Sequence, residues 1–306
     1  MRHLHEHDVA DVVRRIQRRL EHDATIRPLI NPVVDLELLA HSLAGATQLT
    51  WVCERDGEIA GHLYGTLLDD AEYGPGVWVG PDAVSYDDAG VLAALYAHAG
   101  EAWLAAGAKE HYVWSVDDVV ENEPWMELGF ARMHRRGVMR LEGARRHALS
   151  VGYEIRHGSP DDLDLALGLD ASLDEAQSRG PSFLLSAHRS TTRDEMFESL
   201  SDPDVHHYVV DYHGRGVAQC LTFALPPRRG SFDRTIHLSA VSVAAGHRGH
   251  GVGTALVDTA LNDALDAGFE YVETNWRVTN RGAQRHWLRY GFTPTYARLH
   301  RTIGAF

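Results

Sequence analysis

Two hydrophobic periods alternate along this chain, and each marks a different kind of element. Residues 236–243 are predicted to form a strand, since apolar and polar side chains largely alternate. An amphipathic helix is predicted to start at Thr254, because the apolar side chains between Val252 and Leu265 share one side and the acidic ones fall largely on the other. Gly268 follows where a glycine commonly ends a helix. The pattern therefore predicts a strand, a connecting turn and a helix packed by one face.

Each half of the chain also carries a hairpin pattern. Residues 51–64 are predicted to form two strands around Asp56-Gly57, a dipeptide typical of tight hairpin turns. Residues 207–223 are predicted to form two strands around a connection that contains Gly214 and Gly216. A further strand, a helix and a strand follow in both halves. This order predicts an α/β fold (mixed α+β), in which helices flank a twisted mixed sheet.

The two halves of the chain are weakly similar to each other. The segment 106–130, with its Ala-Gly and Gly-Phe pairs, recurs as the segment 267–292, about 160 residues later. That spacing is longer than a solenoid repeat and fits duplicated domains. We therefore expect one domain over residues 1–143 and another over residues 152–306, with a linker between them.

A glycine-rich turn separates the predicted strand from the predicted helix in the second half. Its sequence is His247-Arg248-Gly249-His250-Gly251-Val252-Gly253. Glycines let the backbone approach a ligand closely, and the N–H groups of a helix's first turn have no partner within the helix. Because these groups and the helix dipole both favour negative charge, the turn predicts a site for a phosphorylated ligand.

Composition narrows the class of protein. With 306 residues, of which 44% are hydrophobic and 24% charged, the chain can build a core in each half. Its net charge of −14 argues against nucleic acid as a partner, and it leaves a bound polyphosphate dependent on helix dipoles and local arginines. Cys53 and Cys220 lie far apart, which fits buried apolar residues in a reducing compartment better than a disulfide.

The pattern contains no evident membrane or export segment. Charged residues and histidines occupy the N-terminus, where a signal peptide would be apolar. The most apolar run, residues 91–108, is interrupted by His98 and Glu101 and is short for a membrane span. We therefore expect a cytoplasmic protein with no membrane partner.

Other interpretations of the glycine turn fit less well. A dinucleotide fold requires G-x-G-x-x-G near the start of a domain, whereas these glycines run G-x-G-x-G late in the second half. A Walker loop requires a lysine, which this turn lacks. A turn that only connects two elements is the structural alternative, although three alternating glycines cost backbone entropy.

The turn and a later block together resemble a known family. Arg248-x-x-Gly251-x-Gly253 is similar to the acyl-CoA pyrophosphate loop of the GNAT N-acetyltransferase superfamily, and Asn280-x-x-Ala283 with Gly291-Phe292 is similar to that family's next block. The first half resembles a degenerate copy, with acidic Asp87 and Asp88 in place of the alternating glycines. The arrangement resembles tandem-domain GNAT proteins, a group that includes mycothiol synthase.

The resemblance implies a co-substrate and the residues that hold it. The co-substrate would be acetyl-CoA, and no metal would be needed. The strand before the loop would pair its backbone with the pantetheine arm, the loop amides would hold the pyrophosphate, and Asn280 would lie beside the thioester end. The implied coenzyme-binding residues are Val241, Ser242, Val243, Arg248, Gly249, His250, Gly251, Val252, Gly253 and Asn280.

The base for the reaction is less well defined. Direct acyl transfer to an amine needs a group that takes a proton from the amine. Strand alternation would place His237, Ser239, Val241 and Val243 on one face. His237 is our candidate base, because histidine titrates near neutral pH. Glu273 is a second candidate, and a strand histidine without a catalytic role is the alternative.

The residue at the position of the general acid, which would protonate the leaving thiolate, differs from the family pattern. The position that commonly holds tyrosine is Trp287 here, and an indole is not a useful acid. Tyr290 is our candidate, although three residues along a helix displace it by about 300°. Packing of Tyr290, with solvent as the proton source, is the alternative.

Two further groups of polar residues have a structural and a functional interpretation. Arg281, Arg285 and Arg289 recur every four residues, and they could assist phosphate binding or form a solvated helix face. His3, His5 and His7 would share one side of a strand, as a metal site or as an ordinary polar face.

The sequence as a whole predicts an N-acetyltransferase whose second domain transfers an acetyl group to the amine of a small molecule or peptide. The alternative is a non-catalytic acyl-CoA-binding regulatory module. The acceptor would be enclosed in part by residues 177–188, and the first domain would brace the fold. A homodimer is compatible with this interpretation.

Overall fold

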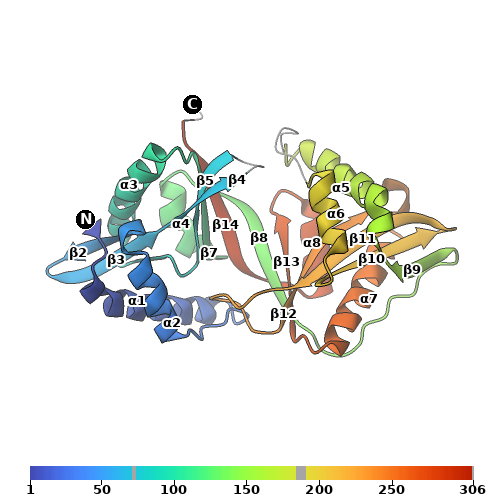
Figure 1. Ribbon diagram of the computed structural model, residues 1–306, viewed down its shortest axis with the longest axis horizontal. Coiled ribbons are helices and arrows are strands. Elements are labelled where there is room, and N and C mark those ends of the chain that lie inside the picture. The colour runs from blue at the N-terminus through green and yellow to red at the C-terminus, as the bar shows by residue number, and fades with distance from the viewer. Residues whose placement is uncertain (71–73, 184–190, 305–306) are drawn as a thin grey trace. The chain divides into compact units, whose positions relative to one another are not determined.

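The computed structural model describes residues 1–70, 74–183 and 191–304, and the chain divides into two compact units (Figure 1). Unit 1 consists of residues 1–136, 228–231 and those from Pro294 onward, and unit 2 of residues 137–227 and 232–293. The units thus depart from the consecutive domains 1–143 and 152–306. A strand belongs to the unit in which it finds hydrogen-bond partners and a buried face. A repeat in the sequence does not specify which neighbouring strand it will pair with.

The strands at the ends of the two repeats account for most of this difference. Strand β14 (Thr293–Thr302), the last of the chain, pairs antiparallel with β7 (Glu110–Val116) of unit 1. Strand β8 (Ala131–Arg140) begins in unit 1, and from Gly137 onward it belongs to unit 2. The end of β8, the last strand of the first repeat, therefore belongs to unit 2. Nearly all of β14, the last strand of the second repeat, belongs to unit 1.

Unit 1 has strands in the orders β1-β2-β3-β6 and β4-β5-β7-β14. Its helices pack on both sides: α3 and α4 contribute to one apolar cluster, and α1 and α2 to another (Figure 1). Its further strands are β1 (Arg2–His3), β2 (Thr50–Arg55), β3 (Glu58–Tyr64), β4 (Thr66–Asp70), β5 (Gly74–Val79) and β6 (Val84–Tyr86). Its helices are α1 (Val9–Ile26), α2 (Leu36–Gly45), α3 (Ala89–Ala105) and α4 (Val119–Glu127).

Unit 2 has strands in the order β13-β12-β11-β10-β9. Helix α7 packs on one face of this sheet, and α5 and α6 pack on the other (Figure 1). The strands are β9 (Tyr153–His157), β10 (Val205–Tyr212), β11 (Arg215–Ala224), β12 (Thr235–Val243) and β13 (Tyr271–Arg277). The helices are α5 (Leu163–Ser178), α6 (Arg193–Ser201), α7 (Val252–Asp266) and α8 (Arg281–Tyr290). Short 3-10 helices are η1 (Glu6–Asp8), η2 (Thr47–Leu49), η3 (Pro160–Asp162) and η4 (Ala245–His247).

The elements predicted from periodicity are confirmed. Strands β2 and β3 form the first hairpin, and Asp56 and Gly57 both have positive φ, as its tight turn requires. Helix α7 buries the predicted apolar side, including Leu256 and Ala260, and Gly268 follows it with a φ of 87°. Cys220 is fully buried, while Cys53 is only partly buried.

Within the described residues, no helix combines the length and apolar character needed to cross a membrane.

A buried carboxylate pairs with an arginine on α1. Arg19 lies 2.9 Å from the carboxylate of Asp23, one helical turn later, and Asp23 is 1% exposed. Burial raises the pKa of Asp23 to about 6, although the Arg19 guanidinium opposes the rise. Because the pKa is higher in the folded chain than in the unfolded chain, folding favours the protonated carboxyl. That contribution is fully present below about pH 4 and is lost as the pH rises through about 6.

We therefore expect Asp23→Asn, which stays neutral, to remove this pH dependence. Between about pH 4 and pH 8, the free energy of unfolding of the wild type should fall by about 3 kcal/mol relative to the variant, at about 1.4 kcal/mol per pKa unit. Urea unfolding followed by circular dichroism measures the difference. Glu21→Gln, an exposed change on the same helix, is the control. A constant difference between Asp23→Asn and the wild type across this range would contradict the assignment.

Candidate functional site

Strands β12 and β13 run parallel and then separate. Their register pairs are Thr235 with Tyr271, Ile236 with Val272 and His237 with Glu273. Beyond these pairs, the Thr274 hydroxyl donates to the Leu238 carbonyl at 2.8 Å, and no further register pair joins the two strands in the part of the chain that the structure describes. The remaining edge of β12 on this side is therefore open to an extended ligand.

A bulge in β12 accompanies this separation. Ala240 has a φ of 50°, and the register between β11 and β12 shifts so that one extra residue of β12 lies opposite Cys220. The bulge overturns the simple alternation predicted from the sequence. Val241 and Val243 pack into the same apolar cluster as Leu238, on the α7 side, so they do not share a face with His237.

The glycine turn leads from the end of β12 to the first turn of α7. Gly249 and Gly251 have φ values of 81° and 79°, a backbone region that favours glycine. Gly251 is the N-cap of α7 and, among the described residues, no side chain caps this helix. Arg248 holds the turn to β12 by donating from Nε to the Val243 carbonyl at 2.7 Å. The first-turn N–H groups thus have no side-chain acceptor among the described residues, and their binding of an anion stays a prediction.

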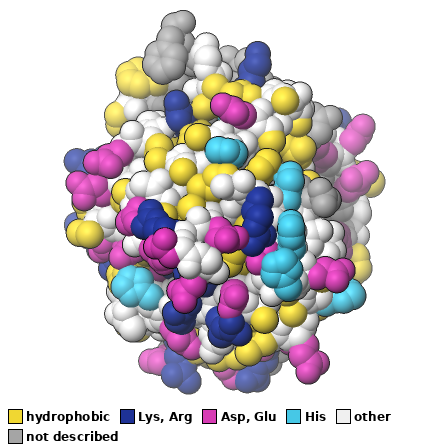
Figure 2. Space-filling view, turned by 90° about the vertical axis from the view of Figure 1, so that its left-hand side faces the viewer, with side chains coloured by type: hydrophobic (Ala, Val, Ile, Leu, Met, Phe, Trp, Pro, Cys, Tyr) yellow, Lys and Arg dark blue, Asp and Glu magenta, His cyan; other side chains and the backbone are white. Residues whose placement is uncertain are grey.

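The corresponding place in unit 1 is already occupied by the protein's own side chains. Asp88 caps α3 by accepting from the Val91 amide at 2.9 Å, and it also pairs with Arg55 at 2.8 Å. Asp87 pairs with Arg15 of α1. Figure 2 shows basic and acidic side chains interspersed on the face at the β2–β3 end of unit 1. Helix α3 of unit 1 is therefore capped by a carboxylate at the place where α7 of unit 2 has no side-chain cap.

The two candidate bases are direct neighbours. His237 and Glu273 are register partners on β12 and β13, with His237 Nδ1 3.7 Å from Glu273 Oε1. Glu273 is 1% exposed, whereas the His237 side chain is 14% exposed and lies against Phe223. The Glu273 carboxylate is thus buried beside the imidazole, within ion-pair distance of Nδ1 but beyond hydrogen-bond distance.

The candidate acid is held elsewhere. The Tyr290 hydroxyl donates to Asp258 of α7 at 2.5 Å, and the Arg145 guanidinium lies over the ring, 4.9 Å from its centroid. Burial, and to a smaller extent the hydrogen bond to Asp258, raises the pKa of Tyr290 well above its ordinary value. Such a phenol is a weaker acid than a free tyrosine. Trp287 is buried and packs edge-on against Phe292, so it is part of the core.

Asn280 has a structural role that accounts for part of its motif. It is the N-cap of α8, and its side-chain oxygen accepts from the Ala283 amide at 3.0 Å. The spacing Asn-x-x-Ala is therefore also a helix-capping pattern. Its position beside a thioester stays a prediction.

An arginine-lined pocket adjoins this region, and sequence reasoning found only part of it. Its lining includes Arg285 and Arg289 of α8, which the helical spacing had singled out, together with Arg145 and Arg146. The latter two lie in the connection between β8 and β9, which the sequence indicated only as a linker. The pocket has a volume of about 690 Å³. Two arginines in an irregular segment gave no periodic signal by which to find them.

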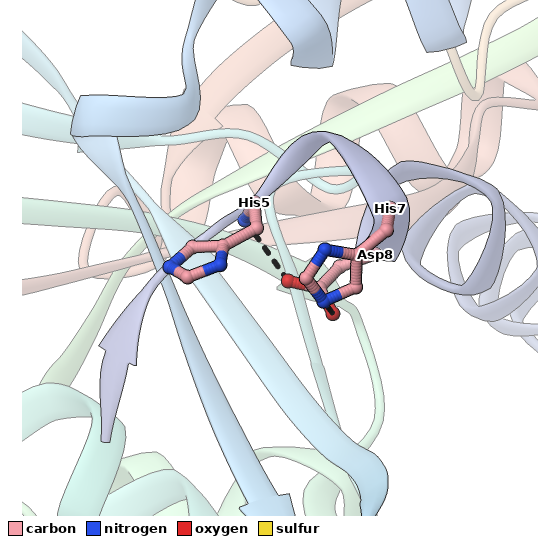
Figure 3. A group of neighbouring side chains, drawn as sticks. All are labelled: His5, His7 and Asp8. Atoms are coloured by element: carbon pink, nitrogen blue, oxygen red, sulfur yellow. Dashed lines mark hydrogen bonds and ion pairs between the residues drawn. The ribbon is translucent and has the colours of Figure 1, made fainter.

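The N-terminal histidines do not form the predicted strand face. Strand β1 covers only Arg2–His3, and His7 lies in η1. His5, His7 and Asp8 come together as a potential metal-binding group, in which one ligand atom of each residue lies within 4.8 Å of the others (Figure 3). The Arg2 guanidinium already binds both carboxylate oxygens of Asp8, and this bond lowers the pKa of Asp8 to about 2. A cation would have to displace Arg2, so this group is a poor metal site.

The family match coincides with this site. Residues 172–292 match the model of the acetyltransferase (GNAT) family, so the chain carries a GNAT domain. This range includes β12, the glycine turn, α7 and α8. No curated protein matches the sequence.

Solved structures with the same fold extend over nearly the whole chain. A GCN5-related N-acetyltransferase from Sphaerobacter thermophilus is similar at a TM-score of 0.64 and 17% identity, covering 99% of this chain and 95% of that one. A tandem GNAT protein from the clavulanic acid biosynthesis pathway gives a TM-score of 0.54 and 17% identity, covering 99% and 98%. A GCN5-related N-acetyltransferase from Kribbella flavida gives 0.51 and 13%, covering 87% and 94%. The predicted mixed α/β GNAT-type fold is confirmed.

Measurement of CoA binding tests whether the start of α7 holds the pyrophosphate. Gly251→Asp should weaken CoA binding by at least about tenfold, because a carboxylate would face the pyrophosphate. Any side chain at Gly251 would also crowd the imidazole of His147, which lies where a Cβ would be placed. Gly251→Asn reproduces that crowding without the charge and should retain more affinity than Gly251→Asp. Isothermal titration calorimetry measures both.

Gly246→Asp is the second control, since Gly246 is exposed, has open space around it and precedes the turn. It should bind CoA as the wild type does. The wild type should bind one CoA per chain, since α3 of unit 1 is capped by Asp88. Unchanged affinity in Gly251→Asp would exclude the turn as the pyrophosphate site.

Proposed function

We propose that this protein is an acetyl-CoA-dependent N-acetyltransferase, and that unit 2 transfers the acetyl group directly to the amine of a small molecule or peptide. The observation that carries the proposal is the combination of a diverging β12–β13 pair with an uncapped, glycine-bounded helix start at the end of β12. An open strand edge can pair with the amides of pantetheine, and the helix start can bind the pyrophosphate.

The coenzyme would lie along β12 toward α7. The backbone of Val241, Ser242 and Val243 would pair with pantetheine, and the amides from Arg248 to Gly253 would hold the pyrophosphate. The bulge at Ala240 supports this arrangement, because it separates the α7-facing part of the strand from the part that carries His237. The coenzyme and the base are thereby assigned to successive segments of one strand.

His237 would act as the base. With Nδ1 facing Glu273, Nε2 is the nitrogen left to take a proton from the acceptor amine, directly or through water. The amine then attacks the thioester carbonyl carbon, the tetrahedral intermediate collapses, and the C–S bond breaks to give the acetylated amine and the CoA thiolate. Solvent supplies the proton to the thiolate, since the hydroxyl of Tyr290 is bound to Asp258.

The acceptor would enter on the α5–α6 side of the sheet. His237 lies against Phe223, and the register partner of Ser239 is Leu221, which packs with α5 and α6. The start of the predicted acceptor loop lies against the end of β13: Gln177 accepts from Arg277 Nε at 2.7 Å, and Ser182 bonds to Thr279 at 2.8 Å. Residues 184–188 of that loop lie outside the described residues.

The alternative function, a non-catalytic acyl-CoA-binding module, is favoured by one observation. Tyr290 is committed to Asp258, and the usual tyrosine position holds a buried tryptophan. Thiol release from acetyl-CoA across a panel of amines separates the two functions. Turnover with any amine supports the transferase, whereas CoA binding without turnover on any amine supports the module.

Replacement of the proposed base should affect chemistry and leave coenzyme binding intact. With an amine that is turned over, His237→Ala should lower kcat by about 10²- to 10⁴-fold and change the Kd for acetyl-CoA by less than about twofold. Glu273→Gln should give a smaller decrease, since it removes only the orienting carboxylate. His206→Ala, an exposed change on β10, is the control. Wild-type kcat in His237→Ala would show that this histidine is not the base.

A further inference from the structure

The arginine-lined pocket of unit 2 carries a charge that its own surroundings do not balance. Arg145, Arg146, Arg285 and Arg289 line it, and the acidic group in the lining is Asp258. Asp258 is 6% exposed and accepts the hydroxyl of Tyr290. Within the described residues, Arg146, Arg285 and Arg289 form no ion pair. In a chain with a net charge of −14, such a cluster marks a place where an anion is favoured.

The connection between β8 and β9 is fastened to this pocket by several hydrogen bonds. The Arg145 amide donates to the side-chain oxygen of Asn262 at 2.9 Å, and the Asn262 side-chain amide donates back to the Arg145 carbonyl at 2.7 Å. Arg145 Nη1 donates to the Tyr290 carbonyl at 2.8 Å. Figure 1 shows this connection passing beside α7. The segment is therefore held against both α7 and α8, which fixes Arg146 beside the arginines of α8.

The pocket reaches the first turn of α7, next to the proposed pyrophosphate site. Thr254, in the first turn of α7, belongs to its lining, and Gly251 of the turn faces His147 of the same connection. A coenzyme whose pyrophosphate lies at the start of α7 therefore has its nucleotide end close to these arginines. CoA carries a phosphate monoester on its ribose, and arginine is well suited to bind such a group through paired hydrogen bonds.

We propose that the β8–β9 connection and α8 together form a site for the ribose 3′-phosphate of the coenzyme, which makes the protein selective for CoA over dephospho-CoA. This inference rests on the proposed function. It assigns the connection between the two repeats a role in ligand binding, through Arg145 and Arg146. It also assigns Arg285 and Arg289 to the coenzyme, the functional one of the two interpretations that their spacing allows.

Calorimetric titration of the full chain with CoA and with dephospho-CoA tests the proposal. The wild type should bind CoA at least about tenfold more tightly, because charge-assisted hydrogen bonds to the extra phosphate are lost in dephospho-CoA. Arg146→Ala and Arg285→Ala should each bring the ratio of the two affinities toward one, with dephospho-CoA affinity within about twofold of the wild type. Arg281→Ala, the same charge change on α8 outside the pocket, should leave the ratio unchanged.

The possible outcomes separate this proposal from the proposed function. Tight and equal binding of both ligands by the wild type would overturn the 3′-phosphate site and leave the coenzyme site in place. An equal loss of affinity for both ligands in Arg146→Ala and Arg285→Ala would also overturn it, since that result reports general electrostatics. If Arg285→Ala alone changed the ratio, the role of the connection would be overturned. No binding of either ligand by the wild type would overturn both proposals.

Discussion

The separation of β12 from β13 after His237 is the constraint on which the rest of the site depends. A strand that keeps both neighbours has no backbone groups left for a ligand, whereas β12 keeps β11 throughout and β13 only over its first three residues. The bulge at Ala240 makes this possible, because it redirects the strand without breaking its ladder with β11. His237, the part of β12 without a β13 partner and the start of α7, which are the proposed base, pantetheine edge and pyrophosphate site, then follow one another along one stretch of chain.

Unit 1 differs from unit 2 at the place that corresponds to the bulge in β12. Where unit 2 has a bulge, unit 1 has a complete break: β5 pairs with β7, and β6 pairs with β3, with residues 80–83 between them. Residues 228–231, from the β11–β12 connection, are part of unit 1, and Arg229 there pairs with Asp82 in the break. Asp88 caps α3 and pairs with Arg55, and the neighbouring Asp87 pairs with Arg15. The place that binds an anion in our proposal for unit 2 is thus satisfied internally in unit 1.

Several features could be predicted because they are local. Asp56-Gly57 forms its turn because both residues tolerate positive φ, and α7 follows from apolar spacing that fits a helix buried by one face. The glycine turn was predictable as the start of a helix for the same reason, since the positive φ of Gly249 and Gly251 needs no distant partner. His237 and Glu273 were predicted only as separate candidates for a base, and the register between parallel strands shows that they are neighbours.

The sequence by itself determined the elements, the mixed α/β class, the duplicated pattern and the glycine-rich turn before α7, because each depends on residues close together in the chain. Only the tertiary structure decided which strand ends belong to which unit, that Val241 and Val243 turn away from His237, that Tyr290 is held by Asp258, and that Arg145 and Arg146 join the arginines of α8. Each of these depends on pairing or packing between segments distant in sequence. A one-residue bulge or a hydrogen-bonded linker is enough to change which side chains meet. Neither feature produces a periodic pattern of apolar residues in the sequence.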